Sequence, residues 1–437
     1  MVSTTACESF DLVVVGAGAA GQMAAIAAAE AGRRVVLLEQ MRRPGLKMLA
    51  SGGGRCNLTN LVAPEDFQAA FGRQGRFMAP ALELMGPARL RQFMDGLGVP
   101  TEASDGRHVF PVSQRAADVQ AALTGRLHRL GVQRRLGRAA ARLWIDNGRL
   151  RGVEAKGGGR LAAGGVVLAC GGRSWPKLGG TGGGYALAEQ AGHDIAEPVP
   201  ALVPLVTAEK SANGDPSGRE SPAETSGWPA RLAGVSLKDA RVRIDLPGQN
   251  KAGLVGDVLF THRGVSGPAA LDISGAVAEL LRGRPSVPLR MELVAGVNPA
   301  QWSRRVDEWR TKSGRRRVVS LLRQHLPESL CLLLCERAGI AGQTAAAHVP
   351  AEKRDLLARL LGGLELTVTG TEGFDAAFVT RGGVKLRHVD PQTLRSRLLP
   401  GLYLAGEMLD LDGPCGGYNL QWAFASGYLA GKSAAAM

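Results

Sequence analysis

The feature that most constrains the fold of this chain lies in residues 10–39. A β-branched run over residues 10–15 ends at glycine, as a buried parallel strand does. The sequence Gly16-Ala17-Gly18-Ala19-Ala20-Gly21 follows, then an alanine-rich helical stretch to about residue 31 and a second strand over residues 34–39. Together they form a βαβ unit with a GxGxxG motif in its proper context, which predicts a dinucleotide-binding domain.

Each glycine of this motif has a predicted task. Gly16 permits the tight turn, Gly18 lets the backbone approach a pyrophosphate, and Gly21 allows close packing of helix on strand. An acid at the end of the second strand is placed to accept a hydrogen bond from a ribose hydroxyl. The residues expected to contact the dinucleotide here are Gly16, Gly18, Ala19, Ala20, Gly21, Glu39 and Gln40.

The rest of the chain indicates a mixed α/β protein with an inserted domain. Strands also run into glycine at residues 165–172 and 401–407, without a second GxGxxG motif. Residues 209–229 are polar and read as an exposed loop, residues 232–297 alternate as strands do, and residues 299–361 have a helical period. We therefore expect a discontinuous Rossmann-like domain over 1–200 and 376–437, a β domain over 201–297 with a return strand at 363–375, and a helical insert over 298–362.

Charge and cysteine usage narrow the class of protein. The net charge is +14 and comes almost entirely from arginine, which fits either a polyanionic partner or an arginine-rich proteome. The six cysteines show no disulfide framework and no zinc spacing, and Cys331 and Cys335 read as thiols in a helix core. Without an apolar run of membrane-spanning length or a signal-peptide charge pattern, we expect a cytoplasmic enzyme that binds neither metal nor membrane.

Two further glycine-rich segments carry chemical groups. In residues 47–60, three glycines precede Arg55, Cys56 and Asn57, so exposed amides and a cation could face a diphosphate or the edge of a flavin. The alternative is a simple glycine turn with a surface arginine. Near the C-terminus, Gly416 and Gly417 open a predicted helix through residue 430, whose N-terminus suits an anionic ligand atom. We expect a side chain at position 417 to enter the space where the backbone meets the flavin.

These motifs resemble those of the HI0933-like family of FAD-dependent flavoproteins. The matching segments span nearly the whole chain in order: residues 16–21, 51–57, 171–176, 181–185, 259–268, 380–384 and 406–421. The resemblance implies an FAD domain built from both ends of the chain, a β-barrel-like insert, a small helical domain, and a reductase or dehydrogenase activity. Two positions depart from the pattern: Cys170 stands where related flavoproteins usually carry threonine, and Gly180 where serine is expected.

The resemblance also implies roles for individual residues. Glu407 takes the place of the acid that holds the flavin ribityl chain, and Gly417, Tyr418 and Asn419 would line the ring. The further residues expected to bind FAD are Gly53, Gly54, Arg55, Cys56, Asn57, Cys170, Gly171, Gly406, Gly416 and Leu420. The catalytic candidates are His262, Cys56 and Tyr418, although a lone histidine is more often structural and Cys56 would also suit a small buried position against the cofactor.

The leading functional hypothesis is an FAD-dependent oxidoreductase that passes hydride from flavin N5 to an activated C=C bond of a small molecule. Because a second nucleotide fingerprint is missing, NAD(P)H would visit the substrate site transiently as the electron donor. One alternative is reduction of uracil to dihydrouracil in RNA, which the eight cations against two acids in residues 304–323, a net +6, would favour. A solvated helix face explains the same run. An alternative of another class is a non-catalytic FAD-binding sensor or assembly protein.

Overall fold

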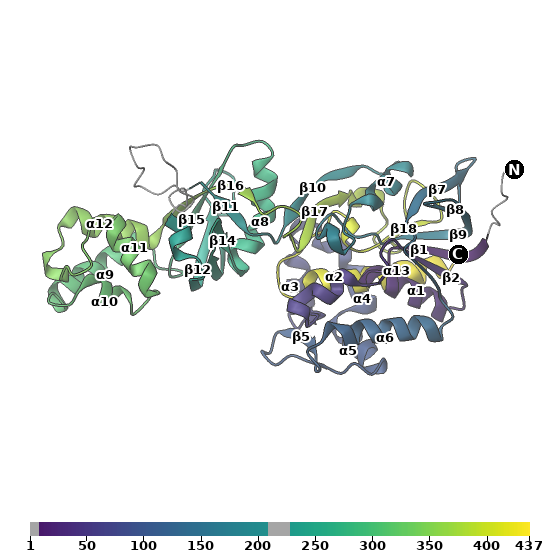
Figure 1. Cartoon of the computed structure of the whole chain (residues 1–437), viewed down its shortest axis with the longest axis horizontal. Helices are drawn as coiled ribbons and strands as arrows, with labels where there is room; N and C mark the ends of the chain where they lie inside the picture. The colour runs from purple at the N-terminus through teal and green to yellow at the C-terminus, as the bar shows by residue number, and fades with distance from the viewer. Residues whose placement is uncertain (1–7, 209–227) are drawn as a thin grey trace. The chain divides into compact units, whose positions relative to one another are not determined.

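The computed structural model describes residues 8–208 and 228–437, which form two compact units (Figure 1). The first unit comprises the chain up to Val199 together with Phe378–Met437, and the second comprises Pro200–Ala377. The mixed α/β class expected from the sequence is confirmed, with a largely parallel sheet in the first unit and a closed barrel in the second. Of the predicted loop at 209–229, residues 209–227 lie outside the described chain, whereas Trp228 and Pro229 are buried in a short 3-10 turn.

The first unit is built on a seven-stranded sheet. Its parallel part has the order β6-β2-β1-β9, with β18 also parallel to β9. Two antiparallel strands, β8 and β7, extend the other end. The bounds are β6 Gln133–Leu136, β2 Val35–Glu39, β1 Glu8–Val15, β9 Arg160–Leu168, β18 Leu402–Leu404, β8 Arg149–Ala155 and β7 Ala140–Asp146.

The strand register brings three distant loops to one edge of the sheet. Val15 lies opposite Leu168, which in turn lies opposite Leu404. The carboxyl ends of β1, β9 and β18 are therefore level, and the glycine-rich segment after each strand starts at the same place. Ligands of open α/β sheets bind at this edge.

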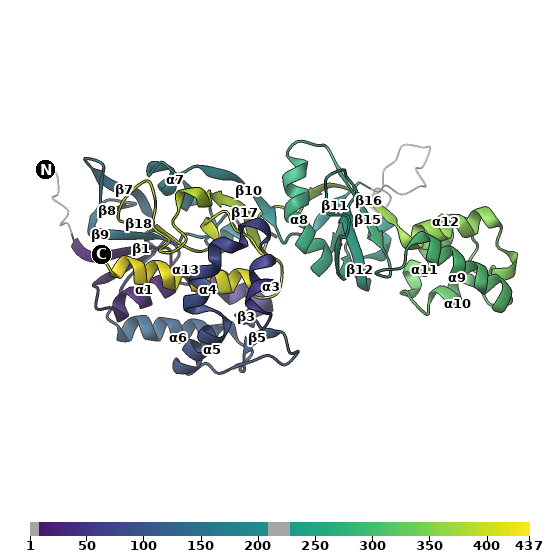
Figure 2. The same ribbon diagram turned by 180° about the vertical axis from the view of Figure 1, so that it is seen from behind.

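Two helices pack closely together on the sheet, α1 (Ala19–Glu30) and α13 (Tyr418–Ala435), and both ribbon views place them side by side (Figures 1 and 2). Glycines on α13 permit the contact: a Cβ added at Gly427 or Gly431 would lie 2.1 Å from the carbonyl oxygen of Ala20 or Ala24. The C-terminal helix is thus held against the helix that follows the GxGxxG motif.

The remaining elements of the first unit surround this core. They are α2 Leu46–Ala50, β3 Thr59–Asn60, α3 Pro64–Ala69, α4 Ala79–Met85, α5 Pro87–Gly96, β4 Thr101–Glu102, β5 His108–Pro111, α6 Ala116–Arg129, α7 Gly183–Gln190, β10 Ile195–Ala201 and β17 Val379–Val384. Strand β17 pairs with β10 in a separate two-stranded sheet.

The second unit contains a closed antiparallel barrel with the order β11-β14-β13-β12-β15-β16. The predicted alternation over 232–297 is confirmed for most of the strands, but it missed the helix α8 (Pro268–Leu281), which packs against β12 and β13. The strand bounds are β11 Leu205–Thr207, β14 Gly264–Ser266, β13 Leu254–Phe260, β12 Ser236–Ile244, β15 Val287–Glu292 and β16 Leu364–Thr371.

Between β15 and β16 the chain forms a group of helices, as its period predicted: α9 Pro299–Lys312, α10 Val318–Leu322, α11 Glu328–Arg337 and α12 Ala351–Gly362. Asn298 and Gln301 cap the start of α9 reciprocally, through hydrogen bonds of 3.0 and 2.8 Å. Cys331 and Cys335 are buried on α11. The prediction that residues 315–317 are helical is wrong, because they lie in the turn between α9 and α10.

Candidate functional site

The GxGxxG turn has the geometry that its residue types predicted. Gly16 has φ +101°, and a Cβ there would lie 2.4 Å from the carbonyl oxygen of Ala169. A Cβ on Gly21 would lie 1.7 Å from the carbonyl oxygen of Gly16, so α1 can pack on the turn only with glycine at position 21. Gly18 differs from both, since nothing lies within 4 Å of an added Cβ. The turn therefore presents open space at Gly18, next to the uncapped N-terminus of α1.

Glu39 ties the second strand to this turn. One carboxylate oxygen accepts a hydrogen bond from the backbone nitrogen of Ala17 at 2.7 Å, and the other accepts from that of Met41 at 2.8 Å. Next to it, the exposed Gln40 donates to the carbonyl oxygen of Gly179 at 2.8 Å. Glu39 thus holds the loop shape and remains half-buried at the edge of the sheet, where a ribose would lie.

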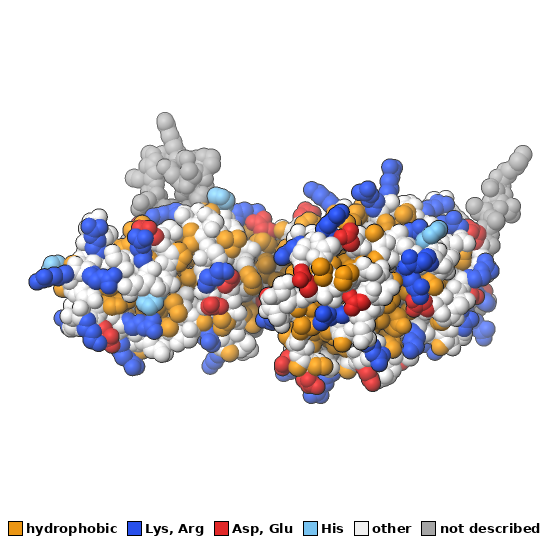
Figure 3. Space-filling model, turned by 90° about the horizontal axis from the view of Figure 1, so that it is seen from below, with side chains coloured by type: hydrophobic (Ala, Val, Ile, Leu, Met, Phe, Trp, Pro, Cys, Tyr) orange, Lys and Arg blue, Asp and Glu red, His pale blue; other side chains and the backbone are white. Residues whose placement is uncertain are grey.

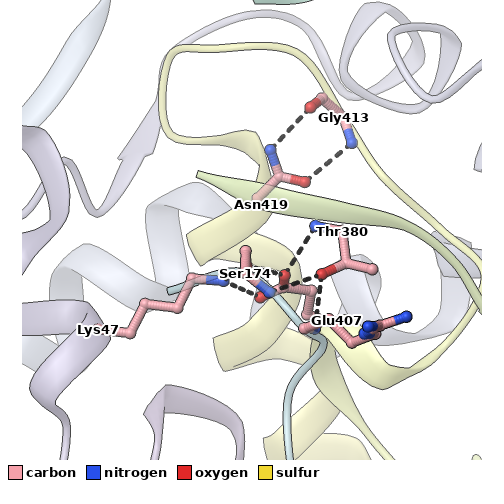
Figure 4. Close-up of polar contacts among 7 residues, drawn as sticks. Lys47, Ser174, Thr380, Glu407, Gly413 and Asn419 are labelled. Atoms are coloured by element: carbon pink, nitrogen blue, oxygen red, sulfur yellow. Dashed lines mark hydrogen bonds and ion pairs between the residues drawn. The ribbon is translucent and has the colours of Figure 1, made fainter. Parts of the chain in front are cut away.

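A carboxylate joins four separate segments at the same edge of the sheet (Figure 4). Glu407, just after β18, accepts from the Ser174 hydroxyl at 2.8 Å and from the Thr380 backbone nitrogen at 2.9 Å, and it forms an ion pair with Lys47. The Thr380 hydroxyl accepts in turn from the backbone nitrogens of Arg173 and Ser174, at 2.8 and 3.1 Å. Lys47, Ser174 and Thr380 were not among the predicted site residues, although all three lie in segments that the motifs covered.

The buried Tyr185 lies close enough to Glu407 to be affected by its charge. Burial raises the pKa of the Tyr185 phenol, and the negative charge of Glu407 adds to the shift. In the described chain its hydroxyl has no hydrogen-bond partner. A buried hydroxyl without a partner beside a polar cluster is the kind of group that a ligand satisfies.

The N-terminus of α13 is organised by its own loop. Gly417 has φ +87° and precedes the first helical residue. The Asn419 amide donates to the carbonyl oxygen of Gly413 at 2.8 Å and accepts from its backbone nitrogen at 2.9 Å, which fixes the preceding loop. The Tyr418 ring is buried 4.7 Å from the Phe67 ring, centroid to centroid.

The expected reason for Gly417 is wrong. A Cβ at this position would lie 2.6 Å from the carbonyl carbon and oxygen of Thr59, and a Cβ at Gly416 would lie 3.0 Å from the imidazole of His108. Glycine at 417 is required by packing against β3, rather than by open space for a ring. A bulky substitution there would displace the protein's own backbone.

The segment after α2 is a tight left-handed turn. Gly52, Gly53 and Gly54 all have positive φ, and Cys56 adopts φ +63°, unusual for a residue with a side chain. Nothing lies within 4 Å of a Cβ added at Gly53 or Gly54. Arg55 is exposed, with its guanidinium 4.6 Å from the centre of the Phe110 ring, and Asn57 is half-buried. The turn is therefore open at Gly53 and Gly54.

Of the two departures from the family pattern, the structure explains Gly180 but not Cys170. The Cys170 thiol lies 3.6 Å from the Val15 carbonyl oxygen, and burial raises its pKa to about 12. Gly171 beside it has φ +70°. At position 180, a Cβ would lie 1.8 Å from the Ser174 carbonyl oxygen, so this backbone excludes the serine that we expected there.

The structure places the remaining candidates as follows. Gly406 has φ +78° and donates its backbone N–H to the Ser426 hydroxyl at 2.9 Å, and Leu420 lies half-buried in the first turn of α13. Cys56 is fully buried. His262 lies in the second unit, exposed in the turn between β13 and β14. Its catalytic role remains a prediction.

Comparison with known proteins decides the family. The model of the HI0933-like protein Rossmann domain matches residues 10–433. The chain belongs to this family. It is 36% identical over 426 residues to the 3-dehydro-bile acid delta(4,6)-reductase of Clostridium scindens, covering 97% of this chain and 98% of the relative. It is 30% identical to the ribosomal RNA dihydrouridine synthase of Escherichia coli, covering 96% and 97%.

This member of the HI0933-like family is an FAD-dependent oxidoreductase. Among solved structures, the fold is similar to that of 3-ketosteroid-delta4-(5alpha)-dehydrogenase from Rhodococcus jostii RHA1, with a TM-score of 0.52, 18% identity, and coverage of 99% of this chain and 98% of that one. Within the described residues, no helix has the length and apolar character needed to cross a membrane.

The residues at the sheet edge fit FAD. Open space at Gly18 beside an uncapped helix N-terminus suits a pyrophosphate, and the half-buried Glu39 suits the adenosine ribose. The unpartnered Tyr185 hydroxyl and the polar cluster at Glu407 supply further hydrogen-bonding groups in the same unit.

Replacing Gly18 with valine tests the cofactor loop. Because no protein atom lies within 4 Å of the added Cβ, we expect Gly18→Val to fold normally and to purify with little or no bound FAD. Bound flavin is measured by absorbance after release, and folding by circular dichroism. Gly96→Val is the matched control, since Gly96 is exposed on α5 with equal free space and should keep full FAD. Full occupancy in Gly18→Val would contradict this placement of the pyrophosphate.

A second prediction concerns the Cys56 thiol, whose pKa burial raises from 9.0 to about 12. The native state therefore holds the proton more tightly than the unfolded state does. Its contribution to stability is complete below pH 9 and is lost as the pH rises from 9 toward 12. We expect the urea midpoint of Cys56→Ala to fall less steeply between pH 8 and 10 than that of the parent, and native Cys56 to resist alkylation at pH 8. Rapid alkylation would instead identify a reactive thiolate.

Proposed function

We propose that this flavoenzyme reduces a carbon–carbon double bond conjugated to a carbonyl group in a small molecule, with electrons from NAD(P)H. The observation that carries the proposal is the 36% identity, over nearly the full length of both chains, to a relative named as a reductase of delta(4,6) bonds in a 3-dehydro-bile acid. The second relative is named for making dihydrouridine, the product of saturating a ring double bond next to a carbonyl. Both names describe the same bond type in different molecules.

Different residues of the chain would bind different parts of the FAD cofactor. The turn at Gly16, Gly18 and Gly21 with the N-terminus of α1 would bind the pyrophosphate, and Glu39 with Gln40 the adenosine end. Glu407, held by Lys47, Ser174 and Thr380, would present a fixed carboxylate to the ribityl chain. Once bound, FAD would supply hydride transfer, which no protein side chain can perform.

The N-terminus of α13 would stabilise negative charge on the flavin ring. Among the described residues no side-chain cap hydrogen bond is found at this helix start, and such an end favours negative charge by about 0.3–1 kcal/mol when exposed and more when partly buried. Directed at the flavin ring edge, this end would favour the reduced, anionic form. The Asn419 clamp on Gly413 would keep the loop and the helix end in one position.

The proton that completes the reduction needs a donor other than Cys56. A thiol whose pKa is raised to about 12 transfers its proton poorly near neutral pH. We do not assign the proton to Tyr418, the other candidate in this unit, because its ring is buried against Phe67. We propose that His262 or a water molecule supplies the proton, as the sequence suggested for this histidine.

An anaerobic half-reaction tests the proposed function. The purified flavoprotein is mixed with NADH or NADPH, and bleaching of the flavin is followed; acceptors are then added separately. We expect one of the two donors to bleach the flavin, and a 4,6-diene-3-oxosteroid to restore its colour at least about tenfold faster than a steroid with an isolated double bond, because an isolated alkene cannot delocalise the developing charge. Equal reoxidation by both steroids, or no bleaching by either donor, would contradict the proposal.

Reduction of uridine in RNA is the second candidate, favoured by the 30% identical full-length relative and by the basic helical segment. The structure reduces the number of available cations there: Lys312 pairs with Glu308, Arg323 pairs with Glu328, and Arg305 lies over the Trp302 ring. In the described chain, Arg304, Arg310 and Arg315 are exposed without an ion pair. Figure 3 shows that acidic side chains are interspersed with Lys and Arg on the face in view.

Substituting these three arginines distinguishes an RNA substrate from a small-molecule substrate. If RNA is bound there, changing Arg304, Arg310 and Arg315 to glutamine should weaken binding to a ribosomal RNA fragment by about tenfold or more and reduce its salt dependence, since each arginine neutralises a phosphate. The control removes the same charge at the exposed Arg107, Arg149 and Arg284, which also lack ion pairs in the described chain. Equal loss in both variants, or no binding by the parent at low salt, would leave the small-molecule reductase.

A further inference from the structure

An open pocket of about 350 Å³ lies in the first unit, and none of its lining residues is among those proposed to hold FAD. Its walls come from the 3-10 turn Gly72–Met78 and from the segment 386–397 that precedes β18. Three arginines line it, Arg73, Arg387 and Arg397, together with the amide of Gln74, and no acidic side chain is among its lining residues. Three guanidinium groups in one lining supply many N–H donors, and charge-assisted hydrogen bonds from such groups suit an anion.

Two of these arginines contact neighbouring acidic side chains. Arg387 pairs with Asp194 and donates from Nε to Nε2 of His388 at 3.1 Å, and Arg397 lies 3.7 Å from Asp390. Each contact uses only part of the five N–H donors of a guanidinium and leaves the others available. The exposed Arg73 has neither an ion pair nor a hydrogen bond from its guanidinium within the described residues. The pocket therefore offers oriented, partly unused donors.

Hydrogen bonds connect the backbone of the wall that carries Arg387 and Arg397 to neighbouring side chains. The buried His193 contacts the Ser396 hydroxyl at 2.8 Å, and that oxygen also accepts from the backbone nitrogens of Leu398 and Leu399 at 3.1 and 3.0 Å. Asp390 accepts from the Thr393 hydroxyl at 2.7 Å. Donors fixed before binding lose little conformational freedom when a ligand arrives.

The same two walls also contribute apolar side chains. Phe77 is half-buried, and its ring lies 6.2 Å from the Trp422 ring, centroid to centroid, at 71°. Val389 lines the same cavity. An inorganic anion would contact only the arginines and leave the apolar surface exposed to water. A molecule with a phosphate at one end and a flat ring at the other would contact both the arginines and the apolar surface. The volume lies at the small end of the range for ligand sites, which suits a mononucleotide or one end of a dinucleotide.

We propose that this pocket binds the phosphate-bearing end of a free nucleotide, with the phosphate between Arg73, Arg387 and Arg397 and the base or sugar against Phe77. Arginine forks match phosphate oxygens in pairs, so three of them lining one open pocket suit a phosphate group. Gln74, which lines the pocket, also donates a hydrogen bond to Asp410 at 3.3 Å. Asp410 lies three residues after Glu407, so Gln74 connects the pocket to the segment that carries the Glu407 cluster. The assignment does not depend on the reaction catalysed, because binding is measured without turnover.

Calorimetric titration of the FAD-loaded protein tests the assignment, with 2′,5′-ADP as the probe. We expect saturable binding that weakens with added salt, and no heat from adenosine, which lacks the phosphates. Arg73→Gln with Arg397→Gln should weaken 2′,5′-ADP by about 100-fold, near tenfold for each charge-assisted contact removed. The control, Arg107→Gln with Arg149→Gln, removes the same charge from exposed arginines outside the pocket and should change the affinity less than twofold.

Several results would overturn the assignment. They are no binding of 2′,5′-ADP to the parent, equal weakening in the control variant, or inorganic phosphate binding as tightly as 2′,5′-ADP. A short single-stranded RNA that binds more tightly than 2′,5′-ADP, and loses affinity in the same pocket variant, would assign the pocket to a polynucleotide instead. Because FAD content and flavin bleaching are recorded for each variant, failure here is separable from failure of the proposed reductase activity.

Discussion

The parallel pairing of β9 with both β1 and β18 is the constraint on which the rest of the first unit depends. It sets Val15, Leu168 and Leu404 at one level, so that three glycine-rich segments from the two ends of the chain begin at the same sheet edge. Gly427 and Gly431 then let α13 rest on α1 at backbone distance. Without this pairing, residues near position 400 would have no reason to lie beside the GxGxxG turn.

Glu407 shows how such an edge becomes a polar site. Its carboxylate is reached by a lysine from α2, by a hydroxyl that follows β9 and by a backbone nitrogen of β17. A half-buried carboxylate is costly unless it is paired and hydrogen-bonded, and here every contact comes from a different segment. The charge therefore stabilises the convergence of these segments and remains available at the edge where we propose the flavin to lie.

The high arginine content has a partly local explanation. Arg126 pairs with Glu30, Arg135 with Glu8, and Arg142 with Glu154, so half of the arginines in residues 126–142 are committed to ion pairs within the unit. A net charge read from the sequence counts these side chains as available, whereas the structure shows which of them already have partners. Two arginines of the proposed phosphate pocket, Arg387 and Arg397, also have acidic partners, Asp194 and Asp390, and they differ from the others only in lining one pocket together with Arg73.

The sequence by itself determined the βαβ unit, the dinucleotide motif, the roles of Gly16 and Gly21, and the succession of an α/β part, a strand-rich part and a helical part, because each depends on residues close together in the chain. That the strands close into a barrel depends on distant pairings such as that of β11 with β16. Helix α8 escaped prediction because its apolar period lies within a stretch that otherwise alternates as strands. Residues 315–317 were misjudged because charge alone does not specify a helix. Only the tertiary structure decided that Gly417 packs against Thr59, that Gly180 excludes serine, and that Lys47, Ser174 and Thr380 meet at Glu407. These contacts join residues up to 360 positions apart, and their partners are set by strand register and packing, which a local pattern does not contain.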